Sequence, residues 1–156
     1  MDRIDFKIVR ILWNNARLSN KDLAKMVGLA PSTCLVRTRQ LQRSGVLTGF
    51  KAGVDPASLG VGLQAMISVR LKRHFKPDVE AFRKHALALP EVVQFYHVAG
   101  PIDFLIHVWT LDSAHLRNFT MTAITAREEV SHIETELIFE HADCAELPSF
   151  LDLPGT

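Results

Sequence analysis

The sequence predicts an α+β protein in which a unit of three helices precedes a unit of four strands and two helices. The apolar residues follow helical spacing up to about residue 44, and they alternate in several segments after residue 62. The charge divides at nearly the same place, since residues 1–51 carry a net charge of +7 and residues 52–156 a net charge of −6. This division indicates a polyanion-binding module joined to a unit with a different task.

Three short helices are expected in the first 51 residues. Asp2 can cap the first helix. Ser19, followed three residues later by Asp22, makes a start like a capping box for the second helix, which Gly28 ends. Pro31 stands at the first position of the third helix, where its missing N–H costs nothing. Two helices joined by a short glycine-containing turn, the second of them basic, are typical of a helix-turn-helix.

The third helix, which should end near Ser44, contains three arginines and no acidic residue. At 100° per residue, Cys34, Thr38 and Leu41 lie on its inner stripe. Hydroxyls near a helix N-terminus allow an anion to come close, arginine can bind guanine or phosphate, and glutamine can pair with adenine. The DNA-contacting residues predicted on the outer side, and just beyond the helix, are Ser32, Thr33, Arg37, Arg39, Gln40, Arg43 and Lys51.

Arg37 has a second interpretation. It lies nearer the flank of the helix than Arg39 and Arg43, so it can instead pair with Asp22 of the preceding helix.

The second half of the chain changes its period twice. Alternating apolar residues predict four strands. Apolar residues at helical spacing predict one helix between the first and second strands and another between the third and fourth. The order strand-helix-strand-strand-helix-strand is the ferredoxin-like split βαβ. Strands are expected at 63–71, 92–98, 102–109 and 130–141, and helices at 77–89 and 112–126. The predicted domains are a helix-turn-helix DNA-binding domain at 1–51, a hairpin or strand linker at 52–62, a ferredoxin-like domain at 63–142 and a tail at 143–156.

The middle hairpin decides which residues face the open side of the sheet. If the hairpin turns at Gly100-Pro101, residues whose numbers add up to 201 lie opposite each other on the two strands, as His97 and Phe104 do. The open face then shows several large apolar side chains, which a lone sheet would leave in water, and this predicts a two-fold homodimer. Two recognition helices in one dimer also suit the reading of two half-sites. The helix-covered face of the hairpin is expected to hold Val93, Phe95, Phe104, Ile106 and Val108, and the open face Tyr96, Val98, Leu105 and Trp109.

The composition argues against several other classes of protein. Cys34 and Cys144 have no metal-type spacing and favour a reduced, cytoplasmic protein. The charged start is unlike a secretory signal, and no apolar stretch approaches the roughly 20 residues of a membrane span. The histidines lack paired ligand spacing, and no nucleophile or phosphate-binding motif is present, so we expect no metal, cofactor or catalytic residue.

Four stretches match a known family: "DRIDFKIVRIL", "ARLSNKDLAKMVGLAPSTCLVRTRQLQRSGVLTGFKA", "HVAGPIDFLIHV" and "VSHIETELIFE". The chain resembles the Lrp/AsnC (leucine-responsive/asparagine, or feast/famine) transcription regulators over nearly its whole length. The resemblance implies dimers formed through the C-terminal sheet, which assemble further into tetramers or octamers. It also implies that a small effector, mostly an amino acid, binds between subunits of the C-terminal domain and changes how the protein acts on double-stranded DNA.

The same resemblance implies an effector loop with the pattern V-x-G-x-x-D. Its Gly100 lets a ligand approach the backbone, and its Asp103 offers a carboxylate to an α-ammonium group, although Asp103 can instead simply cap its own turn. Ala30 replaces the usual serine or threonine cap, and Pro101 and Ile102 depart from the polar residues common in this loop. The effector-binding residues implied by the resemblance are Val98, Ala99, Gly100, Ile102, Asp103, Thr135 and Leu137.

Two alternative functions remain open. Some tetrapyrrole-pathway decarboxylases (siroheme-type) look like this family and use histidines near the pocket, which here would be His97 and His107. Against this, an enzyme would leave the basic recognition helix without a purpose. The other alternative is an architectural DNA-binding protein without an effector, and the retained V-x-G-x-x-D pattern argues against it.

Overall fold

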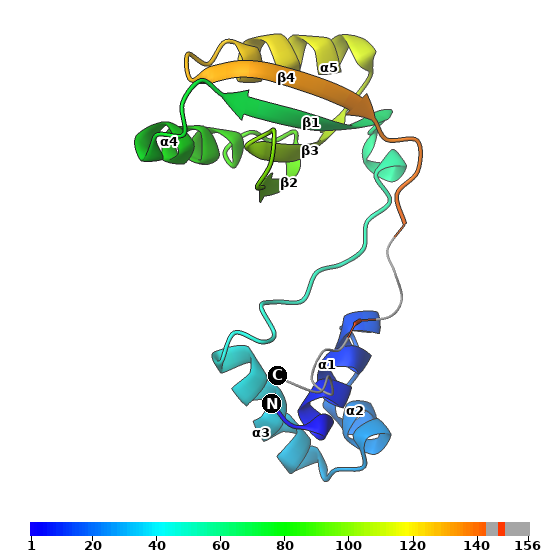
Figure 1. The fold of residues 1–156 in the computed structure, drawn as a ribbon. Helices are drawn as coiled ribbons and strands as arrows, with labels where there is room; N and C mark the ends of the chain where they lie inside the picture. The colour runs from blue at the N-terminus through cyan, green and yellow to red at the C-terminus, as the bar shows by residue number, and fades with distance from the viewer. Residues whose placement is uncertain (143–146, 149–156) are drawn as a thin grey trace. The chain divides into compact units, whose positions relative to one another are not determined.

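The computed structural model describes residues 1–142 and 147–148, so nearly all of the predicted tail lies outside the described residues. The chain divides into two compact units, one built on Met1–Gly53 and the other on Val54–His141 (Figure 1). Each unit has its own cluster of buried apolar side chains. The α+β class predicted from the two periodicities is confirmed.

The first unit contains the three expected helices, α1 (Arg3–Asn14), α2 (Asn20–Val27) and α3 (Pro31–Arg43). The predicted caps are present. Asp2 and Asp5 form a capping box at the start of α1, and the hydroxyl of Ser19 accepts the N–H of Asp22 at the start of α2. Gly28 ends α2 in the left-handed conformation, with φ of 74°, which only glycine adopts at no steric cost.

The core of this unit lies between the three helices. Cys34 and Leu41 of α3 are buried against α1 and α2, which confirms the predicted inner stripe of α3, with Thr38 partly buried beside them. The buried members of the cluster are Ile8, Leu12, Leu23, Ala24, Val27, Cys34 and Leu41. The inner side of α3 is thereby fixed, and its opposite side is left at the surface.

The hairpin or strand predicted between the units is not found. From Ser44 to Gly62 the structure has no strand, and its only regular piece is the 3₁₀ turn Ala57–Leu59. The carboxylate of Asp55 starts this turn by accepting the hydroxyl and the N–H of Ser58 and the N–H of Ala57, and these bonds lower the pKa of Asp55. The turn chemistry of Asp-Pro therefore outweighs the β propensity of the valines nearby.

The second unit is one antiparallel sheet with helices packed on one face. The strand order is β2-β3-β1-β4, as the ferredoxin-like topology requires. Phe82 of α4 stacks on Phe104 of β3 at 5.0 Å between ring centroids, and the buried side chains of α5 complete the same core. The elements are β1 (Leu63–Leu71), α4 (Lys76–Ala86), β2 (Val92–His97), β3 (Phe104–Thr110), α5 (Ser113–Phe119) and β4 (Val130–Leu137).

The register predicted for the β2–β3 hairpin is correct from His97↔Phe104 to Gln94↔His107. Beyond Gln94 the register shifts, and Val92 pairs with Val108. The placement of Val93 on the helix-covered face is therefore wrong: Val93 is 39% exposed, and Val92 packs on the core instead. An irregularity in the strand moved the side chains to opposite faces, which alternation alone does not foresee.

The end of the second unit also differs from the expectation. The second helix of this unit, expected at 112–126, changes into a π-turn at Thr120–Thr125, which buries Ile124 fully and leaves Ala123 partly buried. The last strand ends at Leu137 instead of 141, and Phe139 beyond it is 98% exposed.

Candidate nucleic-acid interface and effector loop

The outer face of α3 is polar, basic and exposed. Ser32 and Thr33 lie in its first turn, and Arg39, Gln40 and Arg43 follow along the same side, all exposed. Ala30 gives no side-chain cap, so the first turn of α3 keeps backbone N–H groups that can bind an anion. Among the described residues, no ion pair holds Arg39 or Arg43, and both guanidinium groups can therefore reach a phosphate or a base.

Arg37 lies on α3 as well, but two carboxylates hold it. Its Nη1 donates to Asp2 Oδ2 at 2.7 Å and to Asp5 Oδ1 at 2.8 Å. The alternative partner Asp22 is not used, because Asp22 Oδ2 accepts the hydroxyl of Ser19 instead. The pKa of Arg37 is raised, mainly by its hydrogen bond to Asp2 and next by that to Asp5. The pKa of Asp2 is lowered, mainly by the hydrogen bond from the backbone N–H of Asp5 and next by that from the Arg37 guanidinium.

Lys51, the last of the predicted DNA contacts, lies in the segment without regular structure after α3 and is exposed. It belongs to the same compact unit as α3. Within the described part of the chain no hydrogen bond or ion pair holds its side chain, so its charge can follow a nearby phosphate.

The loop between β2 and β3 is tied to the end of β1 by its acidic residue. Asp103 Oδ2 accepts the N–H of Leu71 at 2.7 Å, and Asp103 Oδ1 lies 2.7 Å from Nδ1 of His74. The side chain of Asp103 is 3% exposed, whereas that of His74 is 77% exposed. The carboxylate therefore binds a neighbouring strand and loop, which is more than capping its own turn.

The rest of this loop presents backbone and apolar side chains. Gly100 has φ of 140°, a conformation that side chains disfavour. Arg70 Nε donates to the carbonyl oxygen of Pro101 at 2.6 Å, and the N–H of Val98 donates to the carbonyl oxygen of Asp103. Val98 and Ile102 are partly buried, and Ala99 is exposed. The loop is thus well fixed on its β1 side.

Within one chain, Thr135 and Leu137 are not brought against this loop. They lie on β4 opposite Ile67 and Ala65, whereas the loop joins β1 at Val69 and Leu71. Strand β1 also separates β4 from β3. Within one chain the loop and these two residues of β4 therefore do not form one site.

The two histidines of the enzyme alternative do not converge. The His97 ring packs near Phe104 on one face of the sheet, and His107 on the other face lies 3.1 Å from Gln64 Oε1. Burial, together with a smaller effect of His141, lowers the pKa of His107, which favours its neutral form. Within residues 1–142 and 147–148, no three His, Cys, Asp or Glu side chains are grouped so that they could hold a metal ion.

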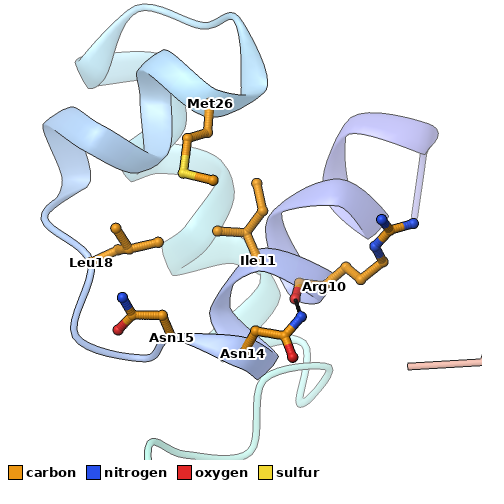
Figure 2. A pocket seen from close by; sticks show the side chains of 6 residues that line it. All are labelled: Arg10, Ile11, Asn14, Asn15, Leu18 and Met26. Carbon is orange, nitrogen blue, oxygen red and sulfur yellow. Dashed lines mark hydrogen bonds between the residues drawn. The ribbon is translucent and has the colours of Figure 1, made fainter. Parts of the chain in front are cut away.

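A shallow depression of about 310 Å³ lies at the end of α1. Figure 2 shows Ile11, Leu18 and Met26 pointing toward one another across it, and Asn14 bonded to the carbonyl oxygen of Arg10. It contains none of the residues predicted to bind DNA or effector. Among the described helices, none combines the length and the apolar character needed to cross a membrane.

Comparison with known proteins agrees with this geometry. The family model of the Lrp/AsnC ligand binding domain matches residues 64–146, and that of a winged helix-turn-helix DNA-binding domain matches residues 1–48. The regulator AldR of Mycolicibacterium smegmatis is 44% identical over 141 residues, covering 90% of this chain and 82% of the relative. The chain belongs to the Lrp/AsnC family. This Lrp/AsnC protein is therefore a helix-turn-helix transcriptional regulator with a ligand-binding domain.

Other relatives of this Lrp/AsnC regulator extend the comparison. The leucine-responsive regulatory protein of Haemophilus influenzae is 35% identical over 90% of this chain and 84% of the relative. A transcriptional regulator of Neisseria meningitidis, solved as an L-Met complex, superimposes with a TM-score of 0.87 at 30% identity and covers 95% of this chain and 96% of its own. An AsnC family regulator of Agrobacterium tumefaciens superimposes with a TM-score of 0.85 at 32% identity, covering 95% and 97%.

Three residues of these sites were missed in the sequence. Asp2 was expected only as the cap of the first helix and Asp5 was given no role, because nothing local in the sequence indicates a partner on α3. His74 lies three residues beyond the end of β1 at Leu71, and it meets Asp103 because the β1–β3 register brings the two loops together. No local pattern in the sequence indicates such a contact.

Proposed function

We propose that this regulator binds double-stranded DNA as a dimer, through the outer face of α3, and that an amino acid bound between subunits changes this binding. The observation that carries the DNA proposal is the exposed face with Arg39, Gln40 and Arg43, on a helix without any carboxylate. Arginine and glutamine are the side chains that read guanine and adenine in the major groove. The proposed contacts also include Ser32, Thr33 and Lys51.

Self-association is proposed through the open face of the sheet. Tyr96 is exposed there, and Met66, Leu105 and Trp109 are partly exposed on neighbouring strands. We propose the dimer as the basic unit, with tetramers or octamers built from it.

The effector is proposed to be an amino acid held at the loop Val98–Asp103, with Thr135 and Leu137 supplied by another subunit. In this structure the carboxylate of Asp103 is occupied by Leu71 and His74. An ammonium group that approaches Asp103 Oδ1 therefore competes with the exposed imidazole of His74 for this oxygen. The L-Met complex of the Neisseria meningitidis relative supports an amino acid as the ligand class.

One experiment tests the DNA part of the proposal. The wild type and the variants Arg39→Ala and Arg43→Ala are titrated onto a labelled duplex selected by the wild type from a random library. Each variant should bind more weakly. The slope of log affinity against log salt concentration should also be less steep by about 1, as expected for the loss of one phosphate contact. Lys7→Ala on α1 is the charge-matched control. Unchanged affinity and slope in both α3 variants would rule out this face.

A second experiment tests the effector part. Thermal shifts of the wild type with each of the twenty amino acids identify the ligand, and His74→Ala and Asp103→Asn are then compared with it. His74→Ala should bind that amino acid more tightly, and Asp103→Asn more weakly, while both still bind DNA. If no amino acid shifts the wild type, there is no amino-acid effector. A full shift in Asp103→Asn places the site elsewhere.

A further inference from the structure

Arg37 was expected among the DNA contacts, and its surroundings suit a different role in DNA binding. Both hydrogen bonds of its Nη1 end on carboxylates of α1, and the side chain is only 31% exposed. Asp5 is more buried still, with 18% of its side chain exposed. The Arg37 charge is compensated by two negative charges, so the cluster adds no net attraction for phosphate.

The two aspartates each divide their oxygens in the same way. Asp2 Oδ1 accepts the N–H groups of Ile4 and Asp5 at 2.9 and 2.8 Å, and its Oδ2 accepts from Arg37. Asp5 Oδ2 accepts the N–H of Asp2 at 3.1 Å, and its Oδ1 accepts from Arg37. One oxygen of each carboxylate therefore caps α1, while the other holds α3.

We propose that Arg37 is a positioning residue for DNA recognition, which sets the rotation and height of α3 through the capping box of α1. Burial of Cys34 and Leu41 determines which side of α3 faces the core, but apolar burial is non-directional and does not by itself set the exact rotation and height of the helix. Arg39 and Gln40 follow Arg37 within one turn, so a rotation of α3 moves both side chains. Charge-assisted bonds to two carboxylates fix direction as well as distance.

The sign of one substitution separates this role from a direct contact. If Arg37 binds phosphate, removing the charge of Asp5 frees the arginine and lessens repulsion, so DNA binding should tighten. If Arg37 acts through the aspartates, the same substitution loosens α3 and weakens binding, although it makes the unit more positive. The pKa of Asp2 lies below its usual value and that of Arg37 above it, so both stay charged throughout the neutral range.

The test is a double-mutant cycle on DNA affinity. Wild type, Arg37→Met, Asp5→Asn and the double variant are titrated onto the same selected duplex, at a temperature where circular dichroism shows each of them folded. We expect Asp5→Asn and Arg37→Met each to weaken binding by about three-fold or more, and the double variant to be no weaker than Arg37→Met alone. Arg37→Lys, which keeps the charge but loses the planar fork, should bind with intermediate affinity.

Asp22→Asn is the matched control, because Asp22 also lies at a helix start of the same unit but pairs with Ser19 instead of Arg37. It should bind DNA as the wild type or slightly more tightly. The proposal would be overturned if Asp5→Asn bound DNA at least as tightly as the wild type, or if the losses of DNA affinity added up in the double variant. Either result would return Arg37 to the DNA contacts. If Arg37→Met does not fold, Arg37→Lys takes its place in the cycle with the same criteria.

Discussion

Gly62, at the entrance to β1, is the described glycine at which an added methyl group would meet other atoms. A Cβ at this position would clash with the backbone carbonyl oxygen of Leu111. That oxygen cannot rotate away as a side chain would. The N–H of Gly62 also donates to the carbonyl oxygen of Thr110 at 3.1 Å, which holds the two segments together. Gly62→Ala must therefore push the linker away from the end of β3.

Forced overpacking of this kind costs about 1–3 kcal/mol. For a unit of this size, each kcal/mol lowers the melting temperature by about 4–8 °C, so Gly62→Ala should melt at least about 4 °C below the wild type. Gly49→Ala and Gly53→Ala are the controls, because a Cβ at either position meets open space and neither glycine has a left-handed φ. Both controls should keep the wild-type melting temperature, measured by calorimetry. A Gly62→Ala variant that melts together with its controls would refute the clash.

Three other substitutions probe the second unit. Phe82→Ala should destabilise it by about 3–5 kcal/mol, measured by urea unfolding, because it empties a fully buried site stacked on Phe104. Burial lowers the pKa of His107, so the unfolded chain takes up a proton at higher pH than the folded one, and the free energy of unfolding should fall as the pH drops below about 6.5. The variant His107→Gln should show a smaller fall, measured by urea titrations at pH about 7.5 and about 5.5. Leu105→Glu places a charge on the open sheet face and should yield smaller particles in light scattering, whereas an unchanged mass would exclude that face as the interface.

The order of helices and strands could be predicted because each element has a strong local signal. The caps at Asp2, Ser19 and Gly28 are local chemistry, and the alternation in β1 follows from burial of one face only. The hairpin register could be predicted as far as Gln94, because one turn fixes it. Beyond that point an irregularity in β2, which depends on packing against the rest of the sheet, changed the face of Val93.

The sites were predictable to different degrees. The outer face of α3 could be predicted from the 100° rotation between successive helix residues, because the position of Cys34 in the core determines which side is left outside. The surroundings of Arg37 and Asp103 were not predictable, because their partners lie about thirty residues away in sequence. Such contacts depend on how helices and strands are arranged in space, which the spacing of residue types does not encode.

The π-turn Thr120–Thr125 has a consequence for how the length of this segment can vary. The buried residues run from Leu116 through Phe119 to Ile124, so the last interval spans five positions where an α-helix would use three or four. The wide turn absorbs one surplus residue without disturbing the start of β4. Deleting the exposed Thr122 should restore an ordinary helix and keep isoleucine in the core, so a relative one residue shorter here should align with a gap at this turn.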